Sequence, residues 1–460
     1  MNNYLISQVM KRIMIALAIL LSVQVADAQV KTPEAAKKAI ESANAAAQNP
    51  KKATKVATWL KLGSAYMDAY NAPQGSAWLG ASKQELQLIM AGEKPVSVGK
   101  AVLGGEPCTK EVYSNKELYF NQNGQLIMIN VTKPVDANAL AKALDAYKKA
   151  YEVDVKKSKE KDVKEAIGNI AKKYLDEGMN CYMLDNYAGA SELFAKAADA
   201  SATAPYSVVD STALYNAGFT AWMVKDYERA KKFFEKCLEI DYYYEGGEVY
   251  AKLADVNTNL GNKDAAREVL EAGFTKFPQS QSILIGLINY YLENNENPER
   301  LFELIALAKV NEPNNASLYY VEGNIYNELR QVEKDEAKAA EYLQKAVAAY
   351  DACEGINAAY EFGHIGKGIM YYNLAIELQE KAANELDDAK WVALNEQFTQ
   401  ALKNALEPFE KAYAVTKDDS LKVNIAEYLK NIYYRFSSDG PEYEAGYKKY
   451  NEVVKSGKPL

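Results

Sequence analysis

The chain has 460 residues, of which 48% are hydrophobic and 25% are charged. This composition is typical of a globular protein, and the length suits two or three ordinary domains or one long array of repeats. The net charge of -8 argues against a nucleic-acid partner, because nucleic-acid binding requires a basic patch or stripe.

The first 28 residues have the pattern of a secretory signal peptide. Lys11 and Arg12 precede the apolar run 13–25, and a small-residue cleavage site of the A-x-A type ends at Ala28. The run is shorter than the about 20 residues that a membrane-spanning helix needs. We therefore expect a periplasmic or secreted protein, cleaved after Ala28, with no integral membrane span in the mature chain.

The stretch TWLKLGSAY, residues 58–66, fits the pattern W-x2-L-G-x2-Y. This is the first-helix signature of the tetratricopeptide repeat, a helix–turn–helix unit of about 34 residues, which the chain resembles here. The second helix of such a unit, with the pattern A-x3-F, does not follow. A related pattern appears only later, at Ala143, Tyr147 and Ala150. We infer that an insert splits the first repeat; the alternative is that the two halves belong to different, incomplete repeats.

The insert, residues 72–135, is predicted to contain a β-hairpin. Its segment KELYFNQNGQLIMINV has two β-prone runs on either side of Asn123 and Gly124. Asn-Gly favours a type I′ turn, in which both central residues have positive φ. A lone hairpin is marginally stable in water, so we expect it to pack against the helices or a partner. The sequence leaves open whether the insert is a recognition element or a tolerated surface insertion.

Four consecutive copies of the two-helix pattern follow the insert. In the first three copies, a small residue of the first helix is followed at constant spacing by a small, a large and a small residue of the second helix, and the fourth copy is weaker. In the two clearest copies these residues are Gly178 with Ala190, Phe194 and Ala197, and Gly218 with Ala230, Phe234 and Cys237. The small residues let the helices approach closely, and stacking of the units supplies the core.

Two later copies are stretched, which indicates longer helices. They comprise Gly323 with Ala339, Leu343 and Ala346, and Gly368 with Ala405, Phe409 and Ala412. A degenerate pair of helices near the C-terminus is expected to cap the array.

The expected fold class is all-α, a tetratricopeptide-like solenoid with a small insert that contains the β-hairpin. The resemblance implies a right-handed superhelix. The expected divisions are a signal peptide (1–28), N-terminal helices with the first half of the first repeat (29–71), the insert (72–135), the second half of that repeat with a linker (136–170), further repeats (171–350), and long-helix repeats with a cap (351–460).

The sequence offers little for catalysis. His364 is the only histidine, which excludes His-pair metal motifs, and GHIGKG lacks the spacing and the Ser/Thr of a phosphate-binding loop. We therefore expect no enzymatic activity, no metal and no cofactor. The four cysteines, Cys108, Cys181, Cys237 and Cys353, are widely spaced. Four cysteines allow three disulfide pairings, and the sequence leaves these open. We expect the cysteines to be buried, free thiols.

The resemblance implies that the first helices of successive repeats line a groove that receives a partner's segment. By register, the first part of this groove is rich in aromatic residues and methionine and comprises Leu175, Met179, Tyr182, Met183, Tyr215, Phe219, Trp222 and Met223. The second part is more polar and comprises Asp255, Asn259, Tyr290, Tyr320, Asn324 and Asn327. No cluster of basic residues suits a peptide's terminal carboxylate. The insert or the C-terminal helices could instead fill the groove.

The expected function is that of a scaffold, adaptor or assembly factor that binds other exported or envelope proteins. Recognition is expected in the groove and in the insert hairpin at Asn123 and Gly124. Two alternatives stay open at this point: a periplasmic chaperone that holds unfolded chains, and a carbohydrate-binding accessory protein whose tyrosines stack on sugars.

Overall fold

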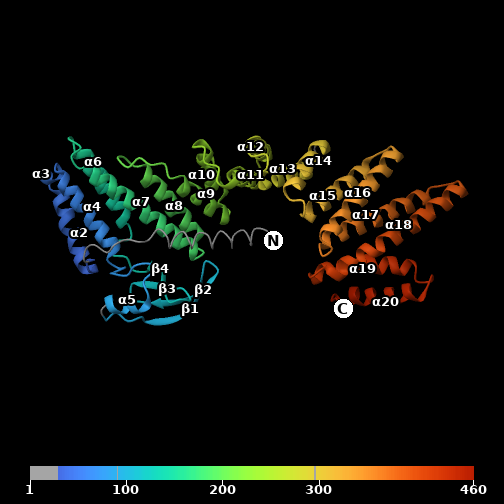
Figure 1. Cartoon of the computed structure of the whole chain (residues 1–460), viewed down its shortest axis with the longest axis horizontal. Coiled ribbons are helices and arrows are strands. Elements are labelled where there is room, and N and C mark those ends of the chain that lie inside the picture. The colour runs from blue at the N-terminus through green and yellow to red at the C-terminus, as the bar shows by residue number, and fades with distance from the viewer. Residues whose placement is uncertain (1–29, 91, 295–296, 460) are drawn as a thin grey trace. The chain divides into compact units, whose positions relative to one another are not determined.

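The computed structural model describes residues 30–90, 92–294 and 297–459. The predicted signal peptide, residues 1–28, lies outside these ranges. The chain divides into two compact units, Met1–Val269 (unit 1) and Leu270–Leu460 (unit 2), each of which is considered by itself. Helices dominate both units (Figure 1). Within the described ranges, no helix is long and apolar enough to cross a membrane.

Unit 1 combines helices with one small sheet. Its helices are α2 (Pro33–Gln48), α3 (Pro50–Ala53), α4 (Val56–Asn71), α5 (Lys83–Ile89), α6 (Ala139–Val153), α7 (Glu160–Met183), α8 (Tyr187–Ala202), α9 (Ser211–Met223), α10 (Tyr227–Glu239) and α11 (Glu248–Asn259), with a short 3-10 helix η1 (Glu245–Gly247). Its strands are β1 (Ser97–Leu103), β2 (Glu106–Val112), β3 (Lys116–Phe120) and β4 (Leu126–Val131). Helix α12 (Lys263–Lys276) begins in unit 1 and ends in unit 2.

Unit 2 is helical in the part of the chain that the structure describes. Its further helices are α13 (Gln281–Asn294), α14 (Pro298–Asn311), α15 (Ala316–Val332), α16 (Glu336–Ile356), α17 (Glu361–Ala383), α18 (Asp388–Val415), α19 (Asp419–Arg435) and α20 (Pro441–Ser456). The long helices that the stretched repeats predict are α16, α17 and α18.

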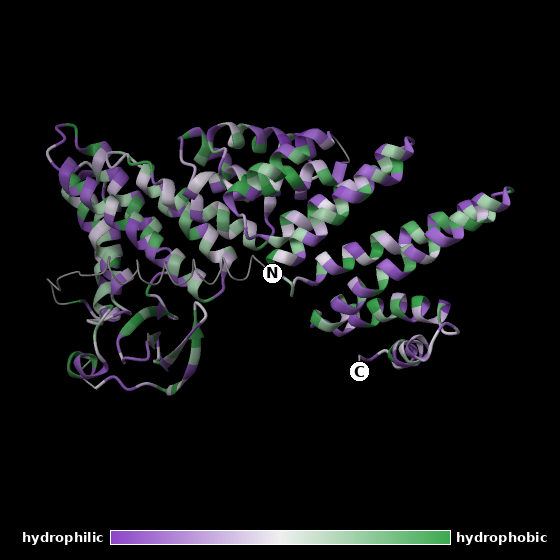
Figure 2. Cartoon of the chain, turned by 45° about the vertical axis from the view of Figure 1, so that its right-hand side comes forward, coloured by the Kyte–Doolittle hydropathy of each residue, from purple (hydrophilic) through white to green (hydrophobic). Residues whose placement is uncertain are grey.

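Polar side chains fix where the repeat helices begin. Asn186, Asp210 and Asp226 precede α8, α9 and α10, and the side chain of each accepts a hydrogen bond from the backbone N–H three residues on. Such a cap satisfies an N–H group that has no partner inside the helix. Apolar residues then recur along the helices, and Figure 2 shows them as hydrophobic stripes beside hydrophilic ones.

Small residues of the first helices lie directly against the rings of the second helices. A Cβ atom added at Gly178 would lie 2.7 Å from the Phe194 ring, and one at Gly368 would lie 2.8 Å from the Phe409 ring. Both rings are fully buried. Because interiors are close-packed, only glycine permits this approach without a shift of the ring. The predicted fold class, an all-α array of helix pairs with a small β insert, is confirmed.

Helices α4 and α6 form one pair although the insert separates them in the sequence. Gly63 of α4 faces Tyr147 of α6, and a Cβ atom at Gly63 would lie 2.6 Å from that ring. This contact repeats the one between Gly178 and Phe194. The chain therefore leaves the pair after α4, forms α5 and the sheet, and returns at α6.

The residues between α5 and α6 form a four-stranded antiparallel sheet with the strand order β1-β2-β3-β4. The predicted hairpin is its β3–β4 pair, in which Leu118 lies opposite Ile129. A second hairpin, β1–β2, turns at Gly104 and Gly105, whose φ angles are 58° and 89°. Positive φ at both positions is what a two-residue type I′ turn requires.

The turn of the predicted hairpin differs from the type I′ turn that we expected. Gly124 has a φ of 75°, but Asn123 is not among the residues with positive φ. The N–H of Gly124 donates to the carbonyl oxygen of Asn121, and the Asn121 side chain accepts the N–H of Asn123 at 3.0 Å and that of Gln125 at 2.9 Å. These hydrogen bonds favour a three-residue loop with one left-handed glycine over a two-residue turn.

The register predicted for the α15–α16 pair is wrong. A Cβ atom at Gly323 would lie 2.7 Å from the ring of Tyr350, which is fully buried, whereas Leu343 is half-buried. The hydroxyl of Tyr350 donates to the side chain of Asn324 on the facing helix, at 2.7 Å. The small–large–small set is therefore Ala346, Tyr350 and Cys353 in place of Ala339, Leu343 and Ala346. The sequence predicts that the α16 residues that contact α15 come later than in the other repeats. In the structure they come later still, by about two helical turns.

Candidate partner-binding surfaces

Four of the eight residues predicted for the first part of the groove are buried. Tyr182, Met183, Tyr215 and Phe219 belong to a hydrophobic cluster that also contains side chains of the sheet. The sheet residues in this cluster are Leu103, Cys108, Tyr119 and Met128. The remaining predicted residues of this part, Leu175, Met179, Trp222 and Met223, are half-buried and pack against the cluster.

Two hydrogen bonds hold the sheet on α7. The N–H of Gly104 donates to the carbonyl oxygen of Met183 at 3.2 Å, and the side-chain amide of Asn180 donates to the carbonyl oxygen of Ile129 at 3.3 Å. The insert therefore covers the first part of the predicted groove. The aromatic residues and methionines of this part are core residues. Their positions in the repeat do not distinguish core residues from groove residues.

A loop covers Tyr215 of α9 in the same way. The ring of Tyr244, which precedes η1, stacks on that of Tyr215 with centroids 4.1 Å apart. Tyr244 has a φ of 52°, so the loop turns sharply to place it there. Burial raises the pKa of Tyr215 far above its ordinary value, and its hydroxyl has no hydrogen-bond partner. Tyr215 is thus a core residue.

Trp222 lies at the border of the covered surface. Its indole N–H donates to the Asp255 carboxylate at 2.5 Å, and Nζ of Lys252 lies 3.9 Å from its ring centroid. These contacts bring α9 and α11 together through a hydrogen bond and a cation–π interaction. Asp255 and Asn259 are exposed, as their polar character predicts.

In unit 2, several of the predicted groove residues contact other residues of the same unit. Tyr290 and Tyr320 are half-buried, and the ring of Tyr320 lies 6.1 Å from that of Tyr360. Asn324 accepts the Tyr350 hydroxyl. The side-chain oxygen of Asn327 accepts a hydrogen bond from Nε of Arg330 at 3.3 Å. Asn123, in the insert turn of unit 1, is exposed, and Gly124 is half-buried.

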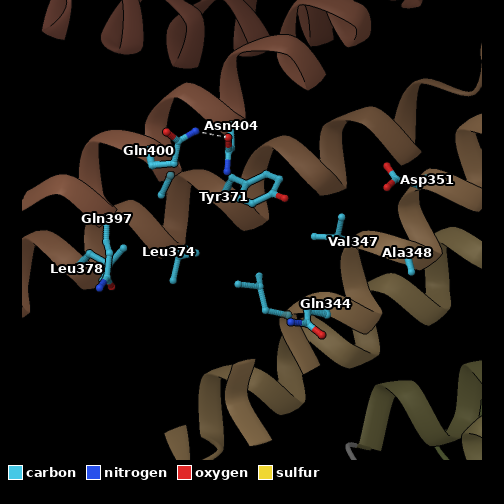
Figure 3. A pocket seen from close by; sticks show the side chains of 12 residues that line it. Gln344, Val347, Ala348, Asp351, Tyr371, Leu374, Leu378, Gln397, Gln400 and Asn404 are labelled. Atoms are coloured by element: carbon cyan, nitrogen blue, oxygen red, sulfur yellow. Dashed lines mark hydrogen bonds between the residues drawn. The ribbon is translucent and has the colours of Figure 1, made fainter. Parts of the chain in front are cut away.

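Unit 2 contains an open groove that the sequence does not predict. It lies between α16 and α18 with α17 at its floor, and it encloses about 580 Å³ (Figure 3). Its floor is apolar and contains Leu343, Val347, Leu374, Leu378 and Ala401. Its rim carries amides, namely Gln344, Gln397, Gln400 and Asn404. Such a surface can exclude water from apolar side chains and offer both hydrogen-bond donors and acceptors.

Ion pairs join the two helix pairs that form this groove. The guanidinium of Arg330 on α15 makes two hydrogen bonds with Glu377 on α17, at 2.7 and 2.8 Å. Two lysines bridge to α16: Lys367 contacts Asp351, and Lys411 lies 2.5 Å from Glu354. A bidentate arginine pair has a fixed geometry, so it orients α15 relative to α17. The walls of the groove are thus held together by charged side chains.

Within the described ranges, no group of three or more His, Cys, Asp or Glu side chains could hold a metal ion. The ring of His364 is buried, and its Nε2 lies 2.9 Å from the carbonyl oxygen of Ala358.

The cysteines are free thiols in the structure. Burial raises the pKa of Cys237 to about 12 and that of Cys353 to about 11. Both therefore stay protonated at neutral pH and pack as small apolar side chains.

A half-buried carboxyl group makes the stability of unit 1 depend on pH. Glu177 of α7 accepts a hydrogen bond from the hydroxyl of Tyr70 of α4 at 2.8 Å, and burial raises the pKa of Glu177. A carboxyl group whose pKa is higher in the folded state binds more protons when folded. Glu177 should therefore contribute stability to unit 1 that grows as the pH falls from the folded-state pKa of this group toward its unfolded-state value, about 4.3.

We expect Glu177→Gln to stabilise unit 1 at pH 7 and to remove this gain at lower pH, because glutamine keeps the acceptor without a charge. The measurement is thermal unfolding of both proteins at pH 7 and pH 5. The control is Glu165→Gln, a change at an exposed residue of the same helix. Equal pH dependence in wild type and Glu177→Gln would contradict the prediction.

Stacked helix pairs, several of which have a glycine against a large ring, define a helical-repeat protein. Two segments, residues 211–244 and 247–275, match the tetratricopeptide repeat family. They contain α9, α10 and α11 and nearly all of α12. The resemblance to a tetratricopeptide repeat protein is therefore confirmed, and these segments are two of its repeats.

Solved structures offer distant likenesses. YrrB, described as a TPR protein with an unusual peptide-binding site, is 19% identical with a TM-score of 0.32, over 48% of this chain and 96% of that one. MamA is 18% identical with a TM-score of 0.30, over 42% and 95%. A TPR repeats protein from Bacteroides fragilis NCTC 9343 is 17% identical with a TM-score of 0.27, over 57% and 97%. Among curated proteins, no match is found.

Proposed function

We propose that this chain is a non-enzymatic protein–protein interaction scaffold whose unit 2 binds an amphipathic helix of a partner protein. The supporting observation is the groove between α16 and α18, with its apolar floor and amide rim (Figure 3). Leu343 and Val347 are four residues apart on α16, and Leu374 and Leu378 are four apart on α17. Each pair forms a ridge about one helical turn long, against which the apolar side of a helix can pack.

We also propose that the partner is an exported protein of the cell envelope. The support is the N-terminal pattern of a secretory signal peptide, with Lys11 and Arg12 before an apolar run and Ala28 at the cleavage site. A scaffold that acts after export meets its partners in the envelope or outside the cell.

Site-specific photo-crosslinking in cells that produce the protein tests the groove. A crosslinker at Gln397, on the rim, should capture a discrete protein, whereas one at Asn424, exposed on α19, should not. The double change Val347→Asp/Leu374→Asp should reduce the capture at least about tenfold, because it places charges on the apolar floor. Circular dichroism of the variant checks that its helices remain folded.

Other outcomes of this experiment would favour the alternatives. Many proteins crosslinked equally from Gln397 and Asn424 would indicate a chaperone that holds unfolded chains. Absence of any crosslinked protein, together with binding to an oligosaccharide array, would favour the carbohydrate-binding function. Either result would contradict a groove-dependent scaffold.

A further inference from the structure

The two edges of the sheet in unit 1 differ in how the chain covers them. At the β4 edge, the N–H of Gly80 donates to the carbonyl oxygen of Leu126 at 2.7 Å, and Asn180 of α7 reaches the carbonyl oxygen of Ile129. Ser82 also forms a bridge with Gln125 beside this edge. At the β1 edge, no described strand lies beside β1 on the side away from β2 (Figure 1). Among the residues that the structure describes, the β4 edge is thus closed and the β1 edge is open.

The register of the β1–β2 hairpin shows which backbone groups are open. Leu103 and Glu106 face each other across the two-residue turn, and such a closing pair is hydrogen-bonded. Hydrogen-bonded pairs alternate along an antiparallel ladder, so alternate residues of β1 face away from β2. The N–H and C=O groups that point to the open edge are those of Val98, Lys100 and Val102.

The side chains of these three residues form an exposed row on one face of the sheet. Val98 is 59% exposed, Val102 is 68% exposed, and Lys100 between them is exposed as well. Natural proteins commonly protect an open edge with proline, a bulge or a short strand. β1 spans seven residues, carries no proline and pairs with β2 without a register shift. Within β1, Lys100 is the charged residue that limits pairing of this edge with other chains.

The charge of Lys100 indicates what can pair with this edge. Glu111, the acidic residue of β2 on the same face, is already paired with Lys83 at 2.9 Å. A second copy of β1, paired about Lys100 or Gly99, would bring two Lys100 side chains opposite or diagonal to each other, and like charges there are unfavourable. A strand with a carboxylate opposite Lys100 would instead form a favourable cross-strand pair.

We propose that the β1 edge binds an extended segment of a partner protein as a fifth, antiparallel strand. The segment carries an acidic residue opposite Lys100 and apolar residues opposite Val98 and Val102. The hydrogen bonds of the backbone supply the affinity, and these three side-chain pairs supply the specificity. This site is separate from the groove proposed above, because it lies within unit 1 and the groove lies within unit 2.

The test uses a fluorescent, end-capped heptapeptide, Thr-Val-Thr-Glu-Thr-Val-Thr, and the full chain. The N–H groups of its Val and Glu residues would face β1, and those of its central Thr residues would face away. N-methylation of the glutamate should therefore weaken binding at least about tenfold, whereas N-methylation of a central threonine should change it less than about threefold. Fluorescence anisotropy measures the affinity.

Variants of the chain provide a matched pair. Val98→Pro removes an N–H group that faces the open edge and leaves the β1–β2 ladder intact, so the sheet should fold. It should weaken binding at least about tenfold, whereas Val98→Thr, which keeps the N–H and the branched shape, should weaken it less than about threefold. Lys100→Glu should reject this peptide and bind its Glu→Lys counterpart.

Hydrogen exchange locates the bound peptide. Addition of the peptide should slow exchange at the N–H groups of Val98, Lys100 and Val102. The proposal is overturned by three results: no binding at up to about 1 mM peptide, equal effects of the two N-methylations, or protection of these N–H groups that rises with protein concentration alone. The last result would identify a second copy of the chain as the occupant.

Discussion

Replacing Leu103 by aspartate is expected to lower the free energy of unfolding of unit 1 by about 3–5 kcal/mol. Leu103 is 1% exposed and lies in the cluster that joins the sheet to α7 and α9. The change removes the burial of a leucine, leaves space within that cluster, and places a carboxyl group among its apolar side chains. Hydrogen exchange of unit 1 measures the loss separately from unit 2, since a repeat array need not unfold in one step.

The neighbouring residue provides the control. Val102→Asp introduces the same group one position earlier, where the side chain is 68% exposed on the opposite face of β1. It should change the free energy of unfolding by less than about 0.5 kcal/mol. Equal free energies of unfolding for the two variants would contradict the packing of the sheet on the helices through Leu103. The first part of the predicted groove in unit 1 would then be open.

The sequence predicts the helix pairs well because their contacts repeat at fixed spacing. Gly178 and Phe194 show the reason: an approach of this kind tolerates only a very small residue on one helix and a ring on the other. The same logic predicts that Gly63 meets its partner only after the insert. The glycine–ring pairing and the late position of the Gly63 partner both follow from steric limits on a local pattern. That pattern can be read directly from the sequence.

The sequence predicts the role of individual groove residues poorly because that role depends on distant segments. Nothing near Tyr182 reveals that Met128, on a strand of the insert, packs in the same cluster. The β1–β2 hairpin was also missed, although Gly104-Gly105 is a recognised signal for a two-residue turn. Its flanking runs contain Pro107 and several polar residues, so they lack a clear strand pattern.

The groove of unit 2 could not be predicted from the sequence pattern for a related reason. It exists because α16 and α18 stand apart over α17, and the angle between successive helix pairs is not encoded in any single spacing. A usable signal was the unusual length of the helices. Where α17 and α18 extend, residues such as Leu378 and Gln397 gain positions that an ordinary repeat does not have.

A double-mutant cycle on Gly368 and Phe409 should reveal strong coupling between α17 and α18. Phe409→Ala alone should cost about 3–5 kcal/mol, because the ring is fully buried and stacks on Tyr428 with centroids 4.8 Å apart. Gly368→Ala alone should cost about 1–3 kcal/mol, because its Cβ would lie 2.8 Å from the ring. The double variant should be more stable than the sum of the two losses predicts by about 1–2 kcal/mol, because the new methyl group then fills space that the ring has left.

Gly355→Ala distinguishes this coupling from a general effect of alanine in a helix. Gly355 lies in α16, also in unit 2, and a Cβ atom added there would meet nothing within 4 Å. This change should be neutral or stabilise unit 2 by up to about 1 kcal/mol, since alanine restricts the unfolded chain more than glycine does. Chemical denaturation of unit 2, followed by hydrogen exchange, measures all four variants. Additive losses at Gly368 and Phe409 would show that the two residues do not touch. This result would contradict the pairing of α17 with α18, on which the long-helix repeat and the floor of the groove depend.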